Sequence, residues 1–535
     1  MSGERTTFDF VIVGAGSAGC VLADRLTRCG RFTVLLVEAG PPDRHMLIDM
    51  PKGYGRLMFN NRYVWHYRTA PIGRNEDGDL WHRGKTLGGS SSINGMMYAH
   101  GQPQDYDDWA AGGAVGWGWD AIGEAFRQIE NHALGPGPHR GVGGPLNIDL
   151  PLRPNPMVDM LIAAGKRIGW TEKADMNEPE PGPGRIGYMP HTLHRGRRVS
   201  AARAFLDPAR ARPNLTIVTD TWAERLVVEN TRVTGVVCRN SSGLVTYRAN
   251  RDTILSLGTI HTPKLLQLSG IGPGSHLQSL GIEVIKDLPG VGANMREHRC
   301  AMMQYRLRRN FSHNSQLRGA GMIASVLRYA LTRTGPMGQP SHPATAIFSS
   351  RPELARNDAL LAFGPYSATL TDKGVAIERE PGMLILGHQL RPESRGTVMI
   401  TAAEFEAPVA IEPNFLSSPM DQQVVVDLVG RVRALMAQDD VTREVAGELE
   451  PSRSMVTPVD IVTMVRDNGL TVQHAAGTCK IGGDESAVVD PRLRVHGIDG
   501  LRIMDCSVMP TLVSGNTNGP VMAMAWHAAN LILKA

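Results

Sequence analysis

The sequence of 535 residues lacks paired cysteines and metal-binding clusters. Its six cysteines are scattered along the chain, and no two form a Cys-x-x-Cys pair. No conspicuous group of histidines and cysteines has the spacing of metal ligands. Dispersed thiols at this frequency are typical of reduced core residues in a cytosolic protein, which argues against a disulfide framework.

The chain also has no excess of one charge and no long apolar run. The net charge is +4, and there is no basic run of the kind that binds nucleic acid or an anionic membrane. The two most apolar stretches, residues 424–436 and 521–533, are interrupted by polar or charged residues, so neither is expected to cross a bilayer. Residues 8–13 lead into a glycine-rich turn, which does not fit a signal peptide. We expect a cytoplasmic protein with no transmembrane segment and no nucleic-acid partner; peripheral membrane association and the oligomeric state stay open.

Length and composition indicate a globular protein with more than one domain. Hydrophobic residues make up 42% of the chain and charged residues 20%, which fits a soluble folded protein rather than a disordered one. A chain of this length is too long for one compact core, so two or more domains are expected.

The clearest local pattern lies near the start of the chain. Residues 8–13 are largely apolar, and they precede the three glycines of a G-x-G-x-x-G motif, Gly14, Gly16 and Gly19. With the helical pattern that follows, this predicts a dinucleotide site in which a pyrophosphate lies on the free N–H groups of a helix start. Glu38 ends a second predicted strand, where an acid can bind a ribose hydroxyl. The motif itself does not say which dinucleotide is bound.

A second stretch, residues 83–97, is rich in glycine and serine. Its small residues offer exposed backbone and short donors to an anionic or flat polar ligand. Arg83 and Lys85 stand on one side of it and apolar residues such as Ile93 on the other. This framing favours ligand contact over the alternative, a flexible linker.

The rest of the chain predicts elements rather than chemistry. Helices are expected at residues 105–132, 263–272 and 419–437, and strands at residues 215–218, 232–237, 253–258, 383–386 and 397–400. The basic cluster at residues 194–198 is expected to be a solvated loop. Residues 299–465 carry no catalytic cluster, and we expect them to form a substrate-shaping domain with an antiparallel sheet.

Two polar residues near the C-terminus have ordinary structural explanations when each is taken alone. His474 lies in a turn of small residues, and a lone histidine is more often structural than catalytic. Asn518 precedes Pro520 and an apolar helix, where asparagine commonly caps the first turn.

Taken in order, these segments resemble the glucose–methanol–choline (GMC) flavoprotein oxidoreductases, on their choline-dehydrogenase-like, bacterial alcohol-dehydrogenase side. The resemblance covers essentially the whole length. Besides the two glycine stretches and the segments of His474 and Asn518, it includes residues 269–273, 289–294 and 390–396.

The resemblance implies an α/β fold (α+β overall) with two domains. One is a Rossmann-like FAD-binding domain, discontinuous in sequence, which comprises residues 1–154, 197–298 and 466–535. The other, residues 155–196 and 299–465, is a substrate domain with an antiparallel sheet flanked by helices.

The resemblance also implies the site residues, by matching position. His474 and Asn518 fall on the family's catalytic pair, and no metal is implied. The implied cofactor-binding residues are Gly14, Gly16, Ser17, Ala18, Gly19, Glu38, Ala39, Trp65, Arg83, Leu87, Gly88, Gly89, Ser90, Asn94, Gly95, Met96, Met97, Ala223, Asp505 and Cys506. Ile93 stands where members with covalent flavin carry histidine, so the implied FAD is non-covalent.

The residue types suit the oxidation of a primary alcohol to an aldehyde. A neutral imidazole such as that of His474 can take the hydroxyl proton while a hydride moves to flavin N5. The Asn518 amide can hydrogen-bond the developing alkoxide. The electron acceptor would be a quinone, a dye-like carrier or oxygen, and a dehydrogenase is favoured over an oxidase.

Other activities remain as alternatives. The same fold supports an oxygen-using alcohol oxidase and a non-redox hydroxynitrile lyase that contains FAD. An NAD dehydrogenase is disfavoured, because that class does not need residues 83–97. The sequence does not predict which alcohol is the substrate.

Overall fold

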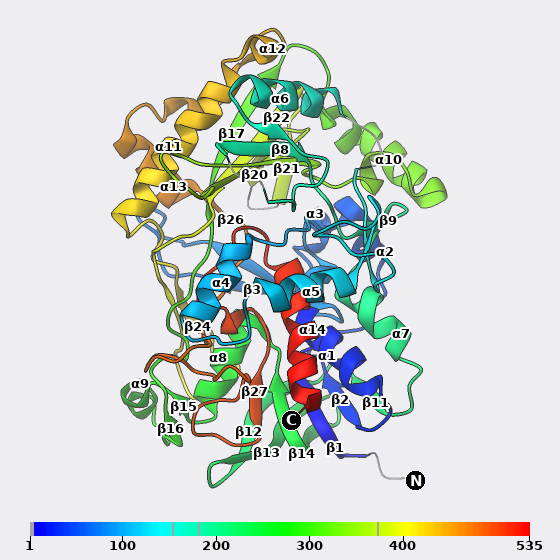
Figure 1. The fold of residues 1–535 in the computed structure, drawn as a ribbon, viewed down its shortest axis with the longest axis vertical. Coiled ribbons are helices and arrows are strands. Elements are labelled where there is room, and N and C mark those ends of the chain that lie inside the picture. The colour runs from blue at the N-terminus through cyan, green and yellow to red at the C-terminus, as the bar shows by residue number, and fades with distance from the viewer. Residues whose placement is uncertain (1–4, 152–154, 180–181, 372–373, 535) are drawn as a thin grey trace.

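A computed structural model describes residues 5–151, 155–179, 182–371 and 374–534, which contain two large β-sheets with helices packed around them (Figure 1). The seven-stranded sheet lies in the lower half of Figure 1 and the eight-stranded sheet in the upper half. This arrangement confirms the predicted α/β fold.

The seven-stranded sheet joins the two ends of the chain. Its order is β11-β2-β1-β14-β13-β12, and β27 pairs with β14. The strands are β1 (Thr7–Val13), β2 (Val34–Val37), β11 (Leu215–Val218), β12 (Trp222–Glu229), β13 (Arg232–Asn240), β14 (Gly243–Leu255) and β27 (Leu501–Ile503). The first half of β14 pairs antiparallel with β13, and its second half lies parallel to both β1 and β27. Strands from near both ends of the chain therefore flank one central strand.

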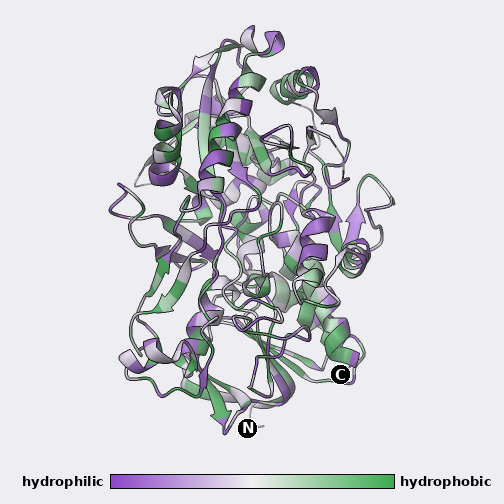
Figure 2. Ribbon diagram, turned by 60° about the vertical axis from the view of Figure 1, so that its left-hand side comes forward, coloured by the Kyte–Doolittle hydropathy of each residue, from purple (hydrophilic) through white to green (hydrophobic). Residues whose placement is uncertain are grey.

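The predicted strand–turn–helix at the start of the chain is confirmed. All four residues of β2 are buried, as expected for a parallel strand covered on both faces. After β1 the chain turns into α1 (Ser17–Thr27), which packs beside the C-terminal helix α14 (Asn518–Lys534). Helix α14 is almost wholly apolar and buried, and it appears green near the C-terminus in Figure 2. The side chains of Arg25 and Asn530 also join the two helices, with 2.6 Å between Nη2 and Oδ1.

The eight-stranded sheet is mainly antiparallel, as predicted. Its order is β25-β17-β22-β19-β18-β8-β7, and β26 pairs with β17. The strands are β7 (Thr171–Glu172), β8 (Gly184–Tyr188), β17 (Arg299–Leu307), β18 (Ala344–Phe348), β19 (Ala359–Gly364), β22 (Gly382–Gln389), β25 (Val445–Glu448) and β26 (Leu470–Thr471). Helix α11 (Pro419–Met436) packs against β22, and α10 (Gly319–Thr332) lies at the edge of this half (Figure 1).

Several predicted elements differ from the structure. The helix expected at residues 105–132 is two helices, α4 (Pro103–Ala111) and α5 (Trp119–Ile129), because glycines with positive φ interrupt the pattern. The helix expected at residues 263–272 is α8 (Gly258–Leu268), which begins earlier. The strand at residues 397–400 pairs only with a neighbouring strand in a two-stranded ribbon. The basic cluster is not a solvated loop, because Arg198 is buried and hydrogen-bonded to the Ile48 carbonyl and to Asn94.

Within the described residues, no helix is both long enough and apolar enough to span a lipid bilayer.

Candidate active site

One large cavity is lined by residues from both sheets. Its volume is about 2050 Å³, roughly twice the upper end of the range for ordinary small-molecule sites. Val13 at the end of β1 lines it from one side, and Leu360 of β19 and His388 of β22 line it from the other. The space is therefore large enough for a dinucleotide together with a small second ligand.

The glycine motif leaves an uncapped helix start on the cavity wall. Gly14 has a φ of +102°, and a Cβ there would lie 2.4 Å from the Ser256 carbonyl oxygen. A Cβ on Gly19 would lie 2.0 Å from the Gly14 carbonyl oxygen, so this glycine lets α1 pack on the turn. No side chain caps α1 and no acid stands in its first turn. Its free N–H groups thus suit an anionic group in the cavity.

The two glycine-rich stretches pack against each other. The Gly88 N–H donates to the Ala15 carbonyl oxygen at 2.8 Å. A Cβ on Gly89 would lie only 2.7 Å from the Cα of Gly16. The second stretch is therefore part of the same wall and not a linker.

Glu38 lies where the motif predicts, but its carboxylate also holds the turn. It accepts from the Ala15 N–H at 3.0 Å and from the Gly40 N–H at 2.9 Å. Burial raises its pKa to about 7, although these two bonds act in the opposite direction. Both roles are compatible, because each carboxylate oxygen has a further lone pair.

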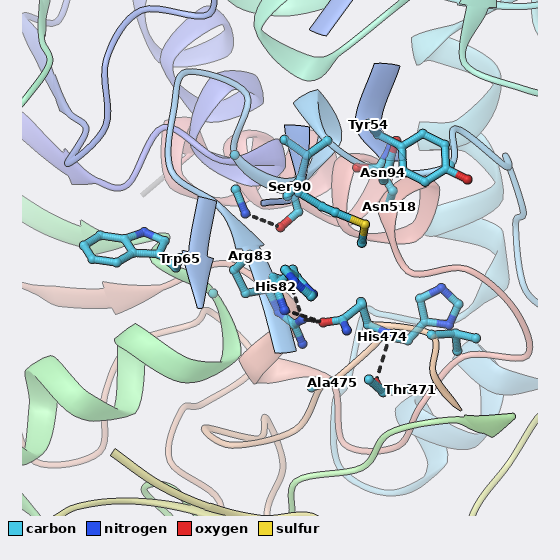
Figure 3. Close-up of a pocket in the computed structure, with 18 of the residues that line it drawn as sticks. Tyr54, Trp65, His82, Arg83, Ser90, Asn94, Thr471, His474, Ala475 and Asn518 are labelled. Atoms are coloured by element: carbon cyan, nitrogen blue, oxygen red, sulfur yellow. Dashed lines mark hydrogen bonds between the residues drawn. The ribbon is translucent and has the colours of Figure 1, made fainter. Parts of the chain in front are cut away.

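An aromatic group marks one end of the cavity. The rings of Trp65 and Trp222 lie 5.7 Å apart, and the Lys85 ammonium lies 4.4 Å from the Trp65 ring. The Trp222 indole N–H donates to the Ala39 carbonyl. In Figure 3, Trp65 lies at one end of the labelled side chains, His474 at the other, and Arg83 between them.

Arg83 is half-buried at the cavity wall, and one of its guanidinium nitrogens has no hydrogen-bond partner. Its Nη1 donates to the His82 carbonyl at 2.9 Å and to the Gln473 side chain. Its Nη2 is buried without a hydrogen-bond partner and lies 3.8 Å from the Glu297 carboxylate. The Glu297 carboxylate is the charge that this enclosed nitrogen faces, and other atoms of Arg83 line the cavity.

Asp505 mainly organises its surroundings. Its carboxylate accepts from the Gly258 N–H at the start of α8, from the Thr262 hydroxyl, and from the Ser507 N–H. It lines the cavity, and so does Cys506.

At the opposite end from Trp65, His474 belongs to a chain of hydrogen bonds. Its Nδ1 lies 3.0 Å from Nδ1 of His298, whose Nε2 lies 2.9 Å from the Leu390 carbonyl oxygen. The side-chain amide nitrogen of Asn516, Nδ2, lies 3.0 Å from the His474 Nε2. The His298 ring also stacks on His388 at 4.3 Å between centroids.

This chain assigns the proton positions of both rings. A carbonyl oxygen only accepts, so His298 must carry its proton on Nε2. Burial lowers the pKa values of His298 and His474 well below 6.5, so both rings are neutral at pH 7. The His298 Nδ1 is then an acceptor, and the proton between the rings belongs to His474 Nδ1. The His474 Nε2 therefore keeps a lone pair, consistent with the amide donor it meets.

Glu297 positions both histidines through their backbone. One carboxylate oxygen accepts from the N–H groups of His474 and His298, each at 2.8 Å. The other accepts from the Ala475 N–H at 2.8 Å. The antiparallel pairing of β26 with β17 brings these segments together.

Asn518 is oriented by the first turn of α1. Its Oδ1 accepts from the Ser17 hydroxyl at 2.7 Å. With the oxygen engaged, the amide N–H₂ is left to donate to a ligand.

Most of the predicted site residues do meet at this cavity. Those that line it are Gly14, Gly16, Ser17, Ala18, Glu38, Ala39, Trp65, Arg83, Gly89, Ser90, Asn94, Gly95, Met96, Met97, Ala223, His474, Asp505, Cys506 and Asn518. Gly19, Leu87 and Gly88 are not on its wall. They pack behind it, where they shape the two glycine-rich turns.

The sequence interpretation missed Glu297, His298, His388 and Asn516. The polar run of residues 296–299 at the start of a strand is the one local signal for the first two. Nothing local marks His388, which lies at the end of an apolar strand, or distinguishes Asn516 from Asn518.

Comparison with known families gives two matches that together cover most of the chain. Residues 8–300 match the amino-terminal profile of GMC oxidoreductases, and residues 392–525 match the carboxy-terminal profile.

Individual relatives are similar over nearly their whole length. An "oxygen-dependent choline dehydrogenase" of Photobacterium profundum is 35% identical over 99% of this chain and 93% of its own. An "alcohol dehydrogenase [acceptor]" of Pseudomonas putida is 34% identical over 98% and 96%. Among solved structures, pyridoxine 4-oxidase from Mesorbium loti has a TM-score of 0.89 and 29% identity, covering 98% of this chain and 99% of its own. Formate oxidase has a TM-score of 0.91 and 27% identity, covering 100% and 99%.

The buried histidines predict a stability that falls in acid. Burial lowers the pKa of His388 from 6.5 to about 4. As the pH falls, the unfolded chain binds this proton first, so the stability from this group is lost between about pH 6.5 and 4. In the variant His388→Gln, the free energy of unfolding should fall less steeply with decreasing pH, by up to about 1.4 kcal/mol per pH unit. Measuring the free energy of unfolding across this pH range checks the prediction, and a variant at an exposed histidine, His496→Gln, serves as the control. If the free energies of unfolding of His388→Gln and the wild type fell in parallel with pH, the prediction would be contradicted.

Proposed function

Because this chain belongs to the GMC oxidoreductase family, we propose that it is an FAD-dependent enzyme that oxidises a primary alcohol to an aldehyde. The observation that carries the proposal is that His474 and Asn518 line the same cavity. His474 offers an unprotonated Nε2, and Asn518 offers a free amide donor. Proton removal from an alcohol needs the first, and the developing alkoxide needs the second.

The cavity fits FAD by its donors and its shape. The uncapped start of α1 with Gly16, Ser17 and Ala18 would hold the pyrophosphate. Glu38, Ala39, Trp65 and Ala223 would hold the adenosine. The flavin half would lie along Arg83, Gly89, Ser90, residues 94–97, Asp505 and Cys506. When bound, FAD supplies the acceptor for the hydride that leaves the alcohol carbon.

In this proposal, His474 accepts the proton of the alcohol's hydroxyl group. The Leu390 carbonyl fixes the His298 tautomer, which leaves His474 Nε2 as the acceptor in the cavity. The lowered pKa of His474 keeps this nitrogen unprotonated over the neutral range. Because the Asn516 amide already occupies Nε2, a bound hydroxyl must displace or share that contact.

We propose that each of the two large sheets belongs to a separate domain, one for the cofactor and one for the substrate. We propose residues 1–154, 197–298 and 466–535 as the cofactor domain, and residues 155–196 and 299–465 as the substrate domain. The distribution of strands in the two large sheets supports this division, with two exceptions. β26 pairs into the second sheet, and residues 197–198 pair with residues 193–194 across the boundary.

For the electron acceptor, we propose a quinone or dye-like carrier in preference to oxygen. The names of the relatives include both an oxygen-dependent and an acceptor-dependent dehydrogenase. The peroxide formed per alcohol oxidised, compared with the dye reduced, distinguishes the two.

Substituting the catalytic pair should separate chemistry from cofactor binding. His474→Ala should slow anaerobic flavin bleaching by alcohol by about 10²–10⁴-fold, because the proton acceptor is lost. Asn518→Ala should slow it by about 10²–10³-fold, because the alkoxide loses a fixed donor. Both proteins should retain bound flavin, and the exposed His496→Ala should react like wild type. A His474→Ala protein that bleaches at the wild-type rate would refute the assigned base.

The flavin should be bound without a covalent bond. Ile93, a buried apolar side chain on the cavity, offers no nucleophile. Acid precipitation of the yellow protein should therefore leave the flavin in the supernatant, and flavin colour in the washed pellet would contradict this.

We propose that the cavity favours a neutral alcohol over a cationic one. Its lining residues include the apolar Met322, Leu360 and Leu386 and the cation Lys52. The Lys52 ammonium donates to two backbone carbonyls, at 2.9 and 2.8 Å, and none of the carboxylates in the described ranges pairs with it. Burial lowers the pKa of Lys52 to about 7, so it carries the positive charge most fully below that pH.

Choline and its neutral carbon isostere, dimethylbutanol, test this directly. At pH 6 the isostere should have the higher kcat/KM, by roughly tenfold, because one cation repels another in a desolvated site. The variant Lys52→Met should bring the kcat/KM values of the two alcohols closer together. Raising the pH through 7 should do the same in the wild type. A wild-type preference for choline at pH 6 would contradict the assignment.

A further inference from the structure

We propose that the outer face of α10 is a docking surface for an anionic lipid bilayer. The helix lies at the edge of the half that holds the eight-stranded sheet (Figure 1). Ile323, Leu327 and Leu331 follow one another at intervals of four residues, and they are 64%, 58% and 84% exposed. Single exposed apolar residues are ordinary on protein surfaces. Three of them along one side of a helix form an apolar patch whose exposure to water is unfavourable in free energy.

The opposite face of α10 holds the helix on the protein. Ser325 and Tyr329 are buried, and their hydroxyl groups donate to the carbonyls of Gln316 and Asp49. Met322 and Val326 line the cavity. The inner face therefore already has its packing partners, and the exposed stripe is an additional surface.

Arginines flank the stripe and form a basic collar. Helix α10 contains no acidic residue; the exposed Arg328 lies on it and the exposed Arg318 precedes it. Arg333 follows the helix, but its guanidinium lies over the ring of the buried Tyr329. The turn between β9 (Leu193–His194) and β10 (Arg197–Arg198) meets its C-terminal end, because a Cβ on Gly196 would lie 2.0 Å from the Arg333 carbonyl oxygen.

This turn adds a further cation to the collar. Arg195 at its tip is exposed. The nearby carboxylate of Asp49 is already paired with Arg197 and Arg203, each at 2.5 Å. It is thus not free to neutralise the collar.

An apolar stripe within a basic collar suits the surface of an anionic membrane. Interfacial helices bury the apolar face at the headgroup boundary while arginines contact lipid phosphates. A second copy of this chain is the less suitable occupant. A twofold interface through the stripe would bring the arginine collars of both copies together, and α10 itself offers no opposing acid.

Flotation of the flavin-loaded protein with vesicles tests the proposal. The wild type should float with vesicles of phosphatidylcholine and phosphatidylglycerol, and much less with phosphatidylcholine alone. The variant I323Q/L327Q/L331Q should lose binding by roughly tenfold or more, because the apolar area available for insertion is removed. The variant R318Q/R328Q should lose the preference for anionic vesicles. The matched control V456Q/V459Q removes two exposed valines elsewhere, 76% and 73% exposed, and should bind like wild type.

All variants should oxidise a short soluble alcohol at the wild-type rate, since none of these side chains lines the cavity. Three outcomes would overturn the proposal. The first is a wild type that stays unbound with anionic vesicles, and the second is a triple variant that floats as well as the wild type. The third is a wild-type dimer that the triple variant converts to monomers, which would assign the stripe to a second copy.

Discussion

The geometry of the candidate active site depends on a short buried chain of hydrogen bonds that starts at the Leu390 carbonyl. That oxygen only accepts, so it determines which nitrogen of His298 is protonated, and His298 in turn determines the tautomer of His474. Burial supports the same state by keeping both rings neutral. A His474 Nε2 that keeps its lone pair follows from these two constraints.

The rest of the structure brings this chain of hydrogen bonds to the wall of the cavity. Glu297 ties the backbone at His298 to that at His474 and Ala475, which lie far apart in sequence. The central strand β14 carries β1 on one side and β27 on the other, so the helices α1 and α14 come to lie together. Ser17 at the start of one helix then orients Asn518 at the start of the other. The glycine motif thus leads directly into the helix whose first residue, Ser17, places Asn518.

The sequence predicted those parts of the site that depend on local pattern. The turn through Gly14, the helix after it and the strand before Glu38 follow from spacing and apolar period, and the structure has them. Gly19 and Gly88 were expected to contact the cofactor, but local sequence cannot distinguish a glycine that faces a ligand from one that lets backbones approach. Glu297, His298 and His388 were missed because their importance arises from pairings across the second sheet. Asn516 was missed because its relation to His474 exists only after the C-terminal segment folds onto that sheet. The roles of His474 and Asn518 stay predictions until they are measured.

The protonation state of His474 is the most direct test of this account. Nitrogen NMR of protein with labelled histidine, assigned by comparison with a His474→Gln protein, reports whether each ring nitrogen carries a proton. The account predicts a neutral His474 at pH 7, with a protonated Nδ1 and an unprotonated Nε2. A doubly protonated ring, or a proton on Nε2, would contradict it.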